Sequence, residues 1–261
     1  MTQSLTVTTY NIHKGFSQFN RRMVIHELRE RLRQLDSDIV FLQEVQGLHL
    51  GHAEAHEDWP GMPQHEFLAE DVWRNAAYGR NVMYSHGHHG NAILSRFPIH
   101  SVHNQDVTHL RFERRGLLHA VIETGLQTEP VHCACVHLSL FGRSRRHQFE
   151  SLAEHLEEIA PGATPLIVAG DFNDWRNRAH DLLAERLGMV EVFCGAGGRR
   201  CLPPRSFPCG LPVFRLDRIY VRGFNVVATE VHFGQGWARI SDHAALTARL
   251  AKPARRERAA A

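Results

Sequence analysis

Short apolar runs recur along the whole sequence, and their length and spacing predict a protein built mainly from strands. The runs that predict strands cover residues 5–11, 39–42, 91–95, 99–106, 117–123, 131–138, 166–169, 216–221, 226–233 and 244–250. Apolar residues that recur with the period of an amphipathic helix predict helices at residues 21–35, 67–73, 144–159 and 178–187. Two stretches have neither period: the polar residues 47–65 predict a long surface loop, and residues 195–212, rich in Gly, Cys and Pro, predict an irregular segment.

This order of elements predicts the fold class. Many strands at hairpin-like spacings with few helices indicate an α/β protein, a four-layer α/β/β/α sandwich in which two mixed sheets pack together with helices outside them. No linker or internal repeat interrupts the pattern, so residues 1–250 are expected to form a single domain. Residues 251–261 are basic and rich in alanine and are expected to be a disordered tail.

Composition narrows the functional class. The formal net charge of +2 argues against a polycation that coats nucleic acid, and 43% hydrophobic content in 261 residues is enough for a substantial core. No apolar run reaches the length of a membrane span, and the N-terminus lacks the charged and apolar regions of a signal peptide. We therefore expect a cytoplasmic monomer without an obligate protein partner.

The cysteines fit a reduced protein. Cys133 and Cys135 alternate along one predicted strand, so both are expected to face a core. Cys194, Cys201 and Cys209 lie in or beside the irregular segment without the Cys-x-x-Cys spacing typical of zinc sites. A zinc site there is the minor alternative.

The most informative segment is Pro165-Leu-Ile-Val-Ala-Gly-Asp-Phe-Asn-Asp-Trp175. Its apolar run, suited to a strand buried on both faces, ends at Gly170, and Asp171 and Asn173 follow. Because residues i and i+2 of an extended chain point the same way, these two polar side chains are expected to project together from the strand's end. That arrangement suits metal or phosphate chemistry, although an Asx-type turn fits the segment equally well.

Polar residues also stand at the ends of other apolar runs. The segments are Tyr10-Asn11-Ile12-His13, Gln43-Glu44, Val136-His137-Leu138, Asp217 within residues 216–221, and Ser241-Asp242-His243. Carboxylate and amide oxygens are the ligands that Mg²⁺ prefers, and a histidine beside carboxylates is the usual general acid or base. A single Asp–His pair is more often a loop hydrogen bond than a catalytic dyad, so only the whole set indicates a hydrolytic site.

The motifs Tyr-Asn-Ile, Leu-Gln-Glu, Gly-Asn-Ala-Ile-Leu-Ser-Arg-Phe-Pro, Val-His-Leu, Gly-Asp-Phe-Asn, Leu-Asp-Arg-Ile and Ser-Asp-His occur in this order between Thr6 and Leu250. In that order they resemble the endonuclease/exonuclease/phosphatase superfamily, which has the fold of pancreatic deoxyribonuclease. Asn-Ile-His-Lys-Gly and Gly-His-His-Gly-Asn-Ala resemble its bacterial YbhP-like branch. The resemblance implies a phosphoesterase that hydrolyses phosphodiester bonds by water attack in a cleft between two sheets, with Mg²⁺ as cofactor and Mn²⁺ as a substitute.

The resemblance also assigns residues to three roles. The metal ligands are Asn11, Glu44 and Asp242. The catalytic residues are His137, Asp171, Asn173, Asp217 and His243. The residues that bind phosphate or substrate are Arg115, with Arg114 nearly as good, and Asn91. His89 joins them for a separate reason, because the loop that carries it could reach the cleft. Asp171 would orient or deprotonate the attacking water. Asp217 would hold His243 against the scissile phosphate, with a carboxylate oxygen about 2.6–3.2 Å from a ring nitrogen.

The substrate is left open by the sequence. A nucleic acid would need a basic groove with aromatic residues, whereas a phospholipid or its headgroup would need an apolar rim beside the site. His13 stands where some abasic-site enzymes of the family carry Asp, which weakens the analogy with DNA repair enzymes. A module that binds a phosphorylated ligand without hydrolysing it is the alternative of a different class, and the complete set of site residues argues against it.

Several other features have two interpretations. His49, His52, His56 and His65 are expected to be solvated in the polar loop, with a second metal site as the minor alternative. The arginines that open the helix at residues 144–159, Arg143, Arg145 and Arg146, are expected to be a solvated helix end or to steer phosphate. Trp175 and Trp237 are expected to pack in the core or at the rim, or else to contact a base or a lipid.

Overall fold

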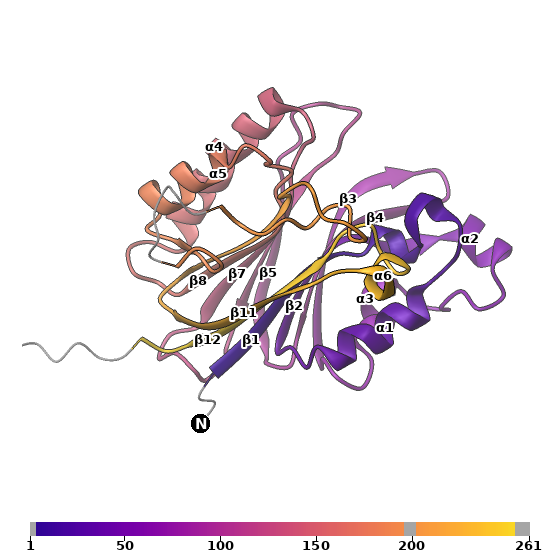
Figure 1. Cartoon of the computed structure of the whole chain (residues 1–261), viewed down its shortest axis with the longest axis horizontal. Helices are drawn as coiled ribbons and strands as arrows, with labels where there is room; N and C mark the ends of the chain where they lie inside the picture. Colours follow the sequence, from indigo (N-terminus) through magenta and orange to yellow (C-terminus); the bar gives the residue numbers. More distant parts are fainter. Residues whose placement is uncertain (1–3, 196–201, 254–261) are drawn as a thin grey trace, which may run out of the picture.

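The computed structural model describes residues 4–195 and 202–253, and it confirms the predicted sandwich (Figure 1). The strands of one sheet are β1 (Ser4–Asn11), β2 (Ile39–His49), β3 (Asn75–Tyr84), β4 (Gly87–Ser95), β11 (Asn225–His232) and β12 (Ala245–Ala251). The strands of the other are β5 (Ile99–Asp106), β6 (Gly116–Ile122), β7 (Val131–His137), β8 (Leu166–Asp171), β9 (Val190–Glu191) and β10 (Asp217–Arg222). Their orders are β11-β12-β1-β2-β4-β3 and β5-β6-β7-β8-β10-β9.

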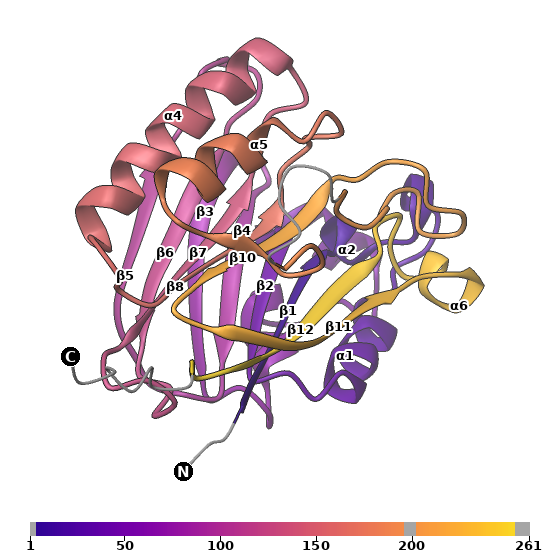
Figure 2. The same cartoon turned by 60° about the vertical axis from the view of Figure 1, so that its left-hand side comes forward.

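Helices cover the outer faces of both sheets (Figures 1 and 2). The helices are α1 (Ile25–Gln34), α2 (Leu50–Ala55), α3 (Gln64–Ala69), α4 (Gly142–Ile159), α5 (Arg178–His180) and α6 (Gln235–Ala238), with short turns η1 (His13–Gly15), η2 (Gln18–Asn20) and η3 (Asp181–Arg186). Side chains of α1 and α3 pack on the first sheet, and those of α4 and η3 pack on the second. Within the described part of the chain, no helix has the length and apolar character needed to cross a membrane.

Strand periodicity explains why the central runs are apolar throughout. Val7 and Phe41 point between the sheets and meet Cys133 and Cys135 of β7 in the central core. Val40, one residue away from Phe41, points outward and packs under α1. A strand that buries both faces needs apolar residues at every position. Both cysteines are fully buried, as predicted.

Both sheets are mixed, as expected, and strands of both sheets finish at the same end of the sandwich. β1 pairs with β2 in parallel, and β7 pairs with β8 in parallel, whereas the other neighbouring strands are antiparallel. One end of the sandwich is where β1, β2, β7 and β8 finish and where β10 and β12 begin. We call it the loop end. Both ends of the described chain lie at the opposite end, since Ser4 pairs with Ala251.

Some local predictions are wrong. Residues 47–65 are not one loop, because β2 continues to His49 and α2 follows it. β3 was not predicted at all: it is an edge strand whose side chains are mostly half-buried or exposed without regular alternation. β4 begins at Gly87, before the predicted start. α3 overlaps the predicted helix at 67–73 but begins and ends earlier, and the predicted helix at 178–187 divides into α5 and the π-helical turn η3. Ala251 belongs to β12, and the predicted tail from residue 254 onward lies outside the described residues.

Candidate active site

Polar residues from both sheets meet at the loop end. His137 ends β7, Asp171 ends β8 and Asp217 opens β10, and Asp171 is the register partner of both. Asn11 reaches across from β1, where its Nδ2 donates to Oδ2 of Asp171 over 3.2 Å. One site is therefore built from strands of two different sheets.

A buried histidine–carboxylate pair forms one side of this site. Nδ1 of His243 lies 2.9 Å from Oδ2 of Asp217, which confirms the predicted contact. Its other ring nitrogen, Nε2, lies 3.8 Å from Oδ2 of Asp171. Burial alone lowers the pKa of His243, but the carboxylates of Asp217 and Asp171 outweigh it and raise the pKa to about 10. The ring therefore carries a proton on each nitrogen at neutral pH.

Asp171 is the central carboxylate. Its Oδ1 accepts a hydrogen bond from the backbone N–H of Asn173 at 2.9 Å, and its Oδ2 lies 3.5 Å from Nε2 of His137. Burial, with a smaller contribution from Asp217, raises the pKa of Asp171 to about 6 against the opposing effect of His243. Burial, with Arg115 and His243 nearby, lowers the pKa of His137 well below its ordinary value. The site thus holds one charged and one neutral histidine around a carboxylate that is ionised above about pH 6.

The backbone is held in unusual conformations where these side chains leave the strands. Glu44 has φ of 58° at a register shift in β2 between Leu42 and Val45, and Asn173 has φ of 51°. Non-glycine residues in this region persist only where the surroundings hold them, and they concentrate at functional sites. Gly170 has φ of 149°, and a Cβ there would lie 1.9 Å from the carbonyl oxygen of Val136. Glycine is therefore required immediately before Asp171.

Three of the predicted residues suit a hard cation. Nδ2 of Asn11 lies 3.4 Å from Oε1 of Glu44, and Oγ of Ser241 donates to the backbone oxygen of Asn11 at 2.7 Å, which brings the Asp242 segment against β1. Oδ1 of Asp242 is buried and has no hydrogen-bond partner among the described residues. Unpartnered buried carboxylate oxygens are rare and are expected at metal ligands. The side-chain oxygens of Asn11, Glu44 and Asp242 are of the kind that hard divalent cations prefer.

A second group of side chains also has the spacing of metal ligands. Asp171, Asp217 and His243 each offer one ligand atom, and these atoms lie within 4.8 Å of one another. Oδ1 of Asp217 is, like that of Asp242, buried without a partner among the described residues. The short contact between Asp217 and Nδ1 of His243 already accounts for one of these ligand atoms.

The predicted substrate-binding residues line one recess beside the site. His89, Asn91, Arg115, Glu44 and His137 share it. Arg115 is held in place because its guanidinium donates to the backbone oxygen of Leu138 and to Glu113. Asn91 donates to the backbone oxygens of Gly116 and Cys135, so it also ties the two sheets together.

The sequence did not reveal every residue of this recess. Asn81 lines it from β3, the strand that periodicity did not reveal. Arg114, the alternative to Arg115, lines it as well. Burial lowers the pKa of His89 to about 4, and Lys14 on the turn after β1 acts in the same direction. No sequence pattern singled out Lys14, which precedes Gly15 in a left-handed turn.

The histidines of residues 49–65 are not solvated as predicted. His49 and His52 stack with ring centroids 3.6 Å apart, and His52 and His56 pack around Phe16 and Trp59. Burial lowers the pKa of His52 to about 4. His49, His52 and His56 form an aromatic cluster with Phe16, in the turn that follows β1, and with Trp59. Within the described part of the chain, these histidines do not form a group with the spacing of metal ligands.

The cysteines are not all reduced. Cys194 takes part in a disulfide, so the prediction is wrong at this position. Cys133, Cys135 and Cys209 are free and buried. Cys201, the remaining member of the alternative zinc site, lies outside the described residues. No metal-binding group found among the described residues contains a cysteine.

Members of the family that the sequence comparison identifies are hydrolases that act on phosphoric esters. The chain belongs to the Endonuclease/Exonuclease/phosphatase family, whose sequence model matches residues 8–243. A protein named YbhP from Escherichia coli K12 is 45% identical over 247 residues, which cover 95% of this chain and 96% of that protein.

Solved structures show the same fold at lower sequence identity. An endonuclease/exonuclease/phosphatase from Beutenbergia cavernae DSM 12333 has a TM-score of 0.74 and 22% identity, over 96% of this chain and 72% of that one. A mannosyl-6-phosphatase from Bacteroides thetaiotaomicron VPI-5482 has a TM-score of 0.69 and 17% identity, over 95% and 99% of the two chains.

Proposed function

We propose that the protein is a metal-dependent phosphoesterase that hydrolyses phosphodiester bonds by attack of water at the loop end. The observation that carries this proposal is the shared oxygen Oδ2 of Asp171. Asn11 donates to it at 3.2 Å, and ring nitrogens of His137 and His243 lie 3.5 and 3.8 Å from it. A buried carboxylate between two imidazoles and an amide suits a water molecule on one side and a phosphate on the other.

Each residue has a role that follows from its protonation and its partners. Asp171, with a pKa near 6, is ionised at neutral pH and accepts the proton of the attacking water. His243 is protonated at neutral pH and donates from Nε2 to a phosphate oxygen, while Asp217 fixes its Nδ1–H. Neutral His137 donates a second hydrogen bond to the phosphate. Asn173 donates from Nδ2 to the backbone oxygen of Leu138 and holds Asp171 through its backbone N–H.

Asn11, Glu44 and Asp242 would hold the metal ion, which we propose is Mg²⁺, with Mn²⁺ as a substitute. A bound divalent cation offsets the negative charge that develops on the phosphate oxygens. Arg115, His89 and Asn91, with Arg114 beside them, would bind the rest of the phosphate from the recess between the sheets. We keep the expectation of a cytoplasmic monomer that acts without a protein partner.

The test is hydrolysis of bis-p-nitrophenyl phosphate by purified protein with Mg²⁺ or Mn²⁺. Activity should require the metal, disappear with EDTA and be absent from Glu44→Ala. A panel of nucleic acid, phospholipid and phosphomonoester substrates under the same metals would then identify the substrate class. No turnover of any of them, together with binding of a phosphorylated ligand, would favour a binding module instead.

A further inference from the structure

Large apolar side chains are exposed at the loop end. Phe112 and Leu211 are each 77% exposed, and Phe19 and Met83 are 71% and 68% exposed. Among the described residues, all the exposed large apolar side chains except Val102 and Val227 lie in the loops or at the strand ends that meet there. Single exposed apolar residues are ordinary, but a set confined to one end of a protein indicates an interaction surface. We call this set the apolar rim.

The apolar rim borders the candidate active site on both sides. Phe112, between β5 and β6, packs edge-on against Phe141, which precedes α4 and follows closely on His137. On the other side, Phe214 packs against Phe207, whose ring centroid lies 5.0 Å from that of His243. A surface that contacts the rim would therefore present its groups directly to the site.

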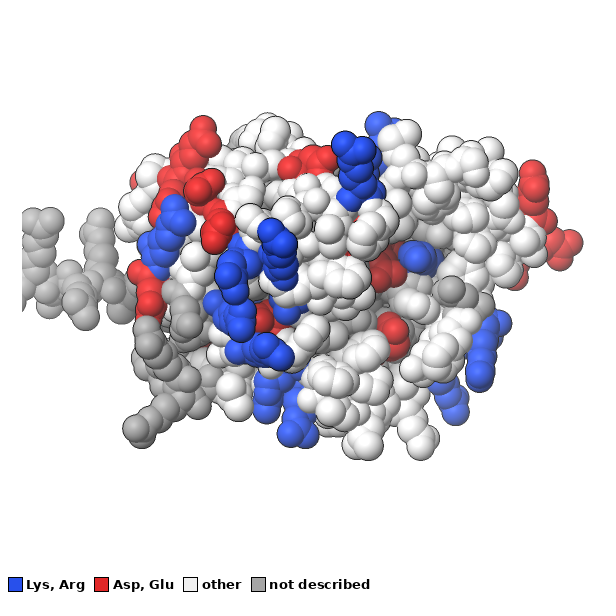
Figure 3. Space-filling model, turned by 90° about the horizontal axis from the view of Figure 1, so that it is seen from above, with Lys and Arg blue, Asp and Glu red and all other residues white. Residues whose placement is uncertain are grey.

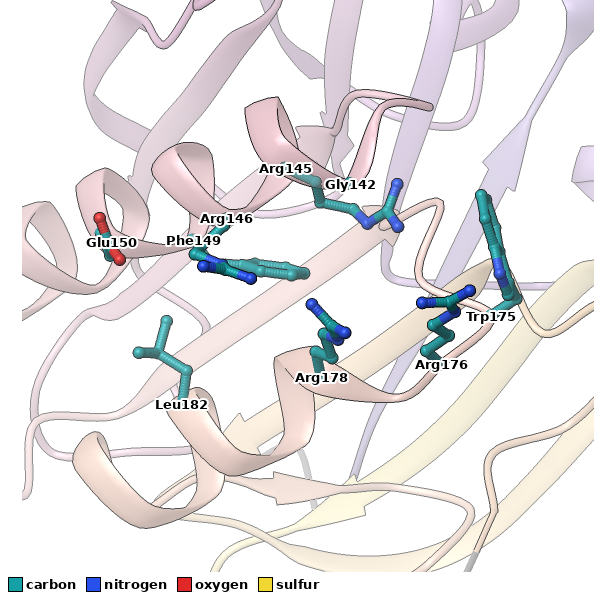
Figure 4. A pocket seen from close by; sticks show the side chains of 9 residues that line it. All are labelled: Gly142, Arg145, Arg146, Phe149, Glu150, Trp175, Arg176, Arg178 and Leu182. Atoms are coloured by element: carbon teal, nitrogen blue, oxygen red, sulfur yellow. The ribbon is translucent and has the colours of Figure 1, made fainter.

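A basic pocket interrupts the apolar rim between α4 and α5. Its volume is about 500 Å³, and Arg145, Arg146, Arg176 and Arg178 line it together with Phe149 and Leu182 (Figure 4). Among the lining residues whose side chains the structure describes, Glu150 is the one that is acidic. Figure 4 shows Arg176 and Arg178 extending into the space between the helices, with Trp175 at its edge. Seen from above, Lys and Arg side chains gather over the half of the molecule that holds α4 and α5 (Figure 3).

Arg145 joins this pocket to the candidate active site. It is buried, contrary to the prediction of a solvated helix end, and its guanidinium donates to the backbone oxygen of Ser139 at 2.7 Å. It also lies 4.8 Å from the ring centroid of Trp175, which is 44% exposed. Ser139 lies two residues after His137, and Trp175 lies two residues after Asn173. His137 and Asn173 both belong to the site. Arg145 and Trp175 therefore connect the pocket to the segments that carry His137 and Asn173.

The aliphatic members of the apolar rim favour a lipid surface over a nucleic acid. Leu140, Leu211 and Val213 are aliphatic and at least half exposed, and aliphatic side chains cannot stack on bases as aromatic rings do. Such side chains gain free energy by entering the boundary between headgroups and acyl chains. Arginines beside them are attracted by anionic headgroups.

We propose that the loop end docks on an anionic phospholipid surface and that the substrate is a phosphodiester in a lipid headgroup. The hydrolytic part rests on the proposed function, whereas the docking does not. In the reaction, the oxygen of water bonds to phosphorus and the bond from phosphorus to one ester oxygen breaks. Asp171 takes the proton of water and passes it on to the leaving alkoxide, so the products are a phosphomonoester and an alcohol.

The experiment is sedimentation of the full chain with phosphatidylcholine vesicles, with and without phosphatidylglycerol, in EDTA. The test variant is Phe112→Ser with Phe141→Ser. The matched control is Val102→Ser with Val227→Ser, which removes two apolar side chains that are 50% and 51% exposed away from the loop end. Wild type and control should bind the anionic vesicles. The test variant should bind about tenfold more weakly, because two aromatic side chains no longer enter the lipid.

A second variant tests the basic pocket. Arg146→Ser with Arg178→Ser should lose the preference for anionic over neutral vesicles while keeping the native thermal unfolding transition. The proposal is overturned if wild type does not bind anionic vesicles, or if the rim variant and its control bind equally. Binding of a single-stranded oligonucleotide that depends on Phe112 and Phe141, without vesicle binding, would point to a nucleic acid instead. Vesicle binding without hydrolysis of any lipid or soluble phosphodiester would refute the proposed function and leave the docking intact.

Discussion

Replacing Asp217 with asparagine tests the histidine–carboxylate pair most directly. The substitution keeps an oxygen that can accept from Nδ1 of His243 but removes the charge. Both side chains are buried and their atoms are 2.9 Å apart, so the contact is a charge-assisted hydrogen bond shielded from solvent. A hydrogen bond to a charged group contributes about 1.5–3 kcal/mol, which corresponds to a loss in kcat/KM of roughly tenfold to 150-fold. His243→Ala should lose more, about two to four orders of magnitude.

The same substitution should change the pH dependence. The raised pKa of His243 keeps the ring charged through neutral pH. The activity of the wild-type enzyme should therefore fall only as the pH approaches about 10. Without the Asp217 carboxylate the proton leaves at lower pH. The same 1.5–3 kcal/mol equals a shift of about one to two pH units, so the alkaline limb should move down by that amount.

The assay is kcat/KM for bis-p-nitrophenyl phosphate across neutral and alkaline pH at saturating metal. Asp174→Asn is the matched control, because Asp174 is also buried and its carboxylate accepts from the backbone N–H of Ala179 rather than from a catalytic group. Its alkaline limb should stay in place. An Asp217→Asn enzyme with the wild-type rate, or with an unmoved alkaline limb, would show that this carboxylate does not govern His243.

Three further predictions concern strain and charge at the site. Glu44→Gly should unfold at a higher temperature in EDTA than Glu44→Ala, because glycine accepts φ of 58° without strain. Mn²⁺ should raise the unfolding temperature of the wild type but of neither variant. Asp171→Asn should raise the unfolding temperature at pH 8 in EDTA. The reason is that a carboxyl whose pKa is raised to about 6 in the folded protein destabilises the fold above that pH. The difference in unfolding temperature between variant and wild type should vanish below the ordinary pKa of 3.8. An unfolding temperature unchanged at pH 8 would contradict this. Gly170→Ala should lower the free energy of unfolding in urea by more than Gly188→Ala, since a Cβ at Gly170 meets the Val136 carbonyl and one at Gly188 meets nothing within 4 Å. Equal losses would show that the contact relaxes.

The sequence predicted best those strands that bury both faces. Residues 39–42 and 166–169 are apolar at every position because each has the central core on one side and helices on the other. β3 has one neighbour and contains Gly79, Arg80 and Asn81, so its pattern carried no signal. The prediction of the recess was therefore incomplete at Asn81. Histidines 49 and 52 were misjudged because a hydropathy pattern treats as polar a ring that also stacks.

The site residues could be named from motifs, but their geometry could not. Asn11 and Asp171 lie 160 positions apart and in different sheets, and only the packing of the sheets brings Nδ2 to Oδ2. The same packing buries Asp171 and raises its pKa. The pairing of Asp217 with His243 was the exception, because the chemistry of a positioned imidazole required a carboxylate beside it.

The adjacency of the first and last strands has a consequence for synthesis. β1 lies between β2 and β12, and Thr8 and Thr247 share a hydrogen bond across 239 positions of sequence. A growing chain therefore carries β1 with one unpaired edge until its last strand emerges, and contacts so distant in sequence form slowly. A chain that stops before residue 241 would lack Asp242 and His243 as well as β12. We expect such truncated chains to be catalytically inert and prone to aggregate through the open edge of β1.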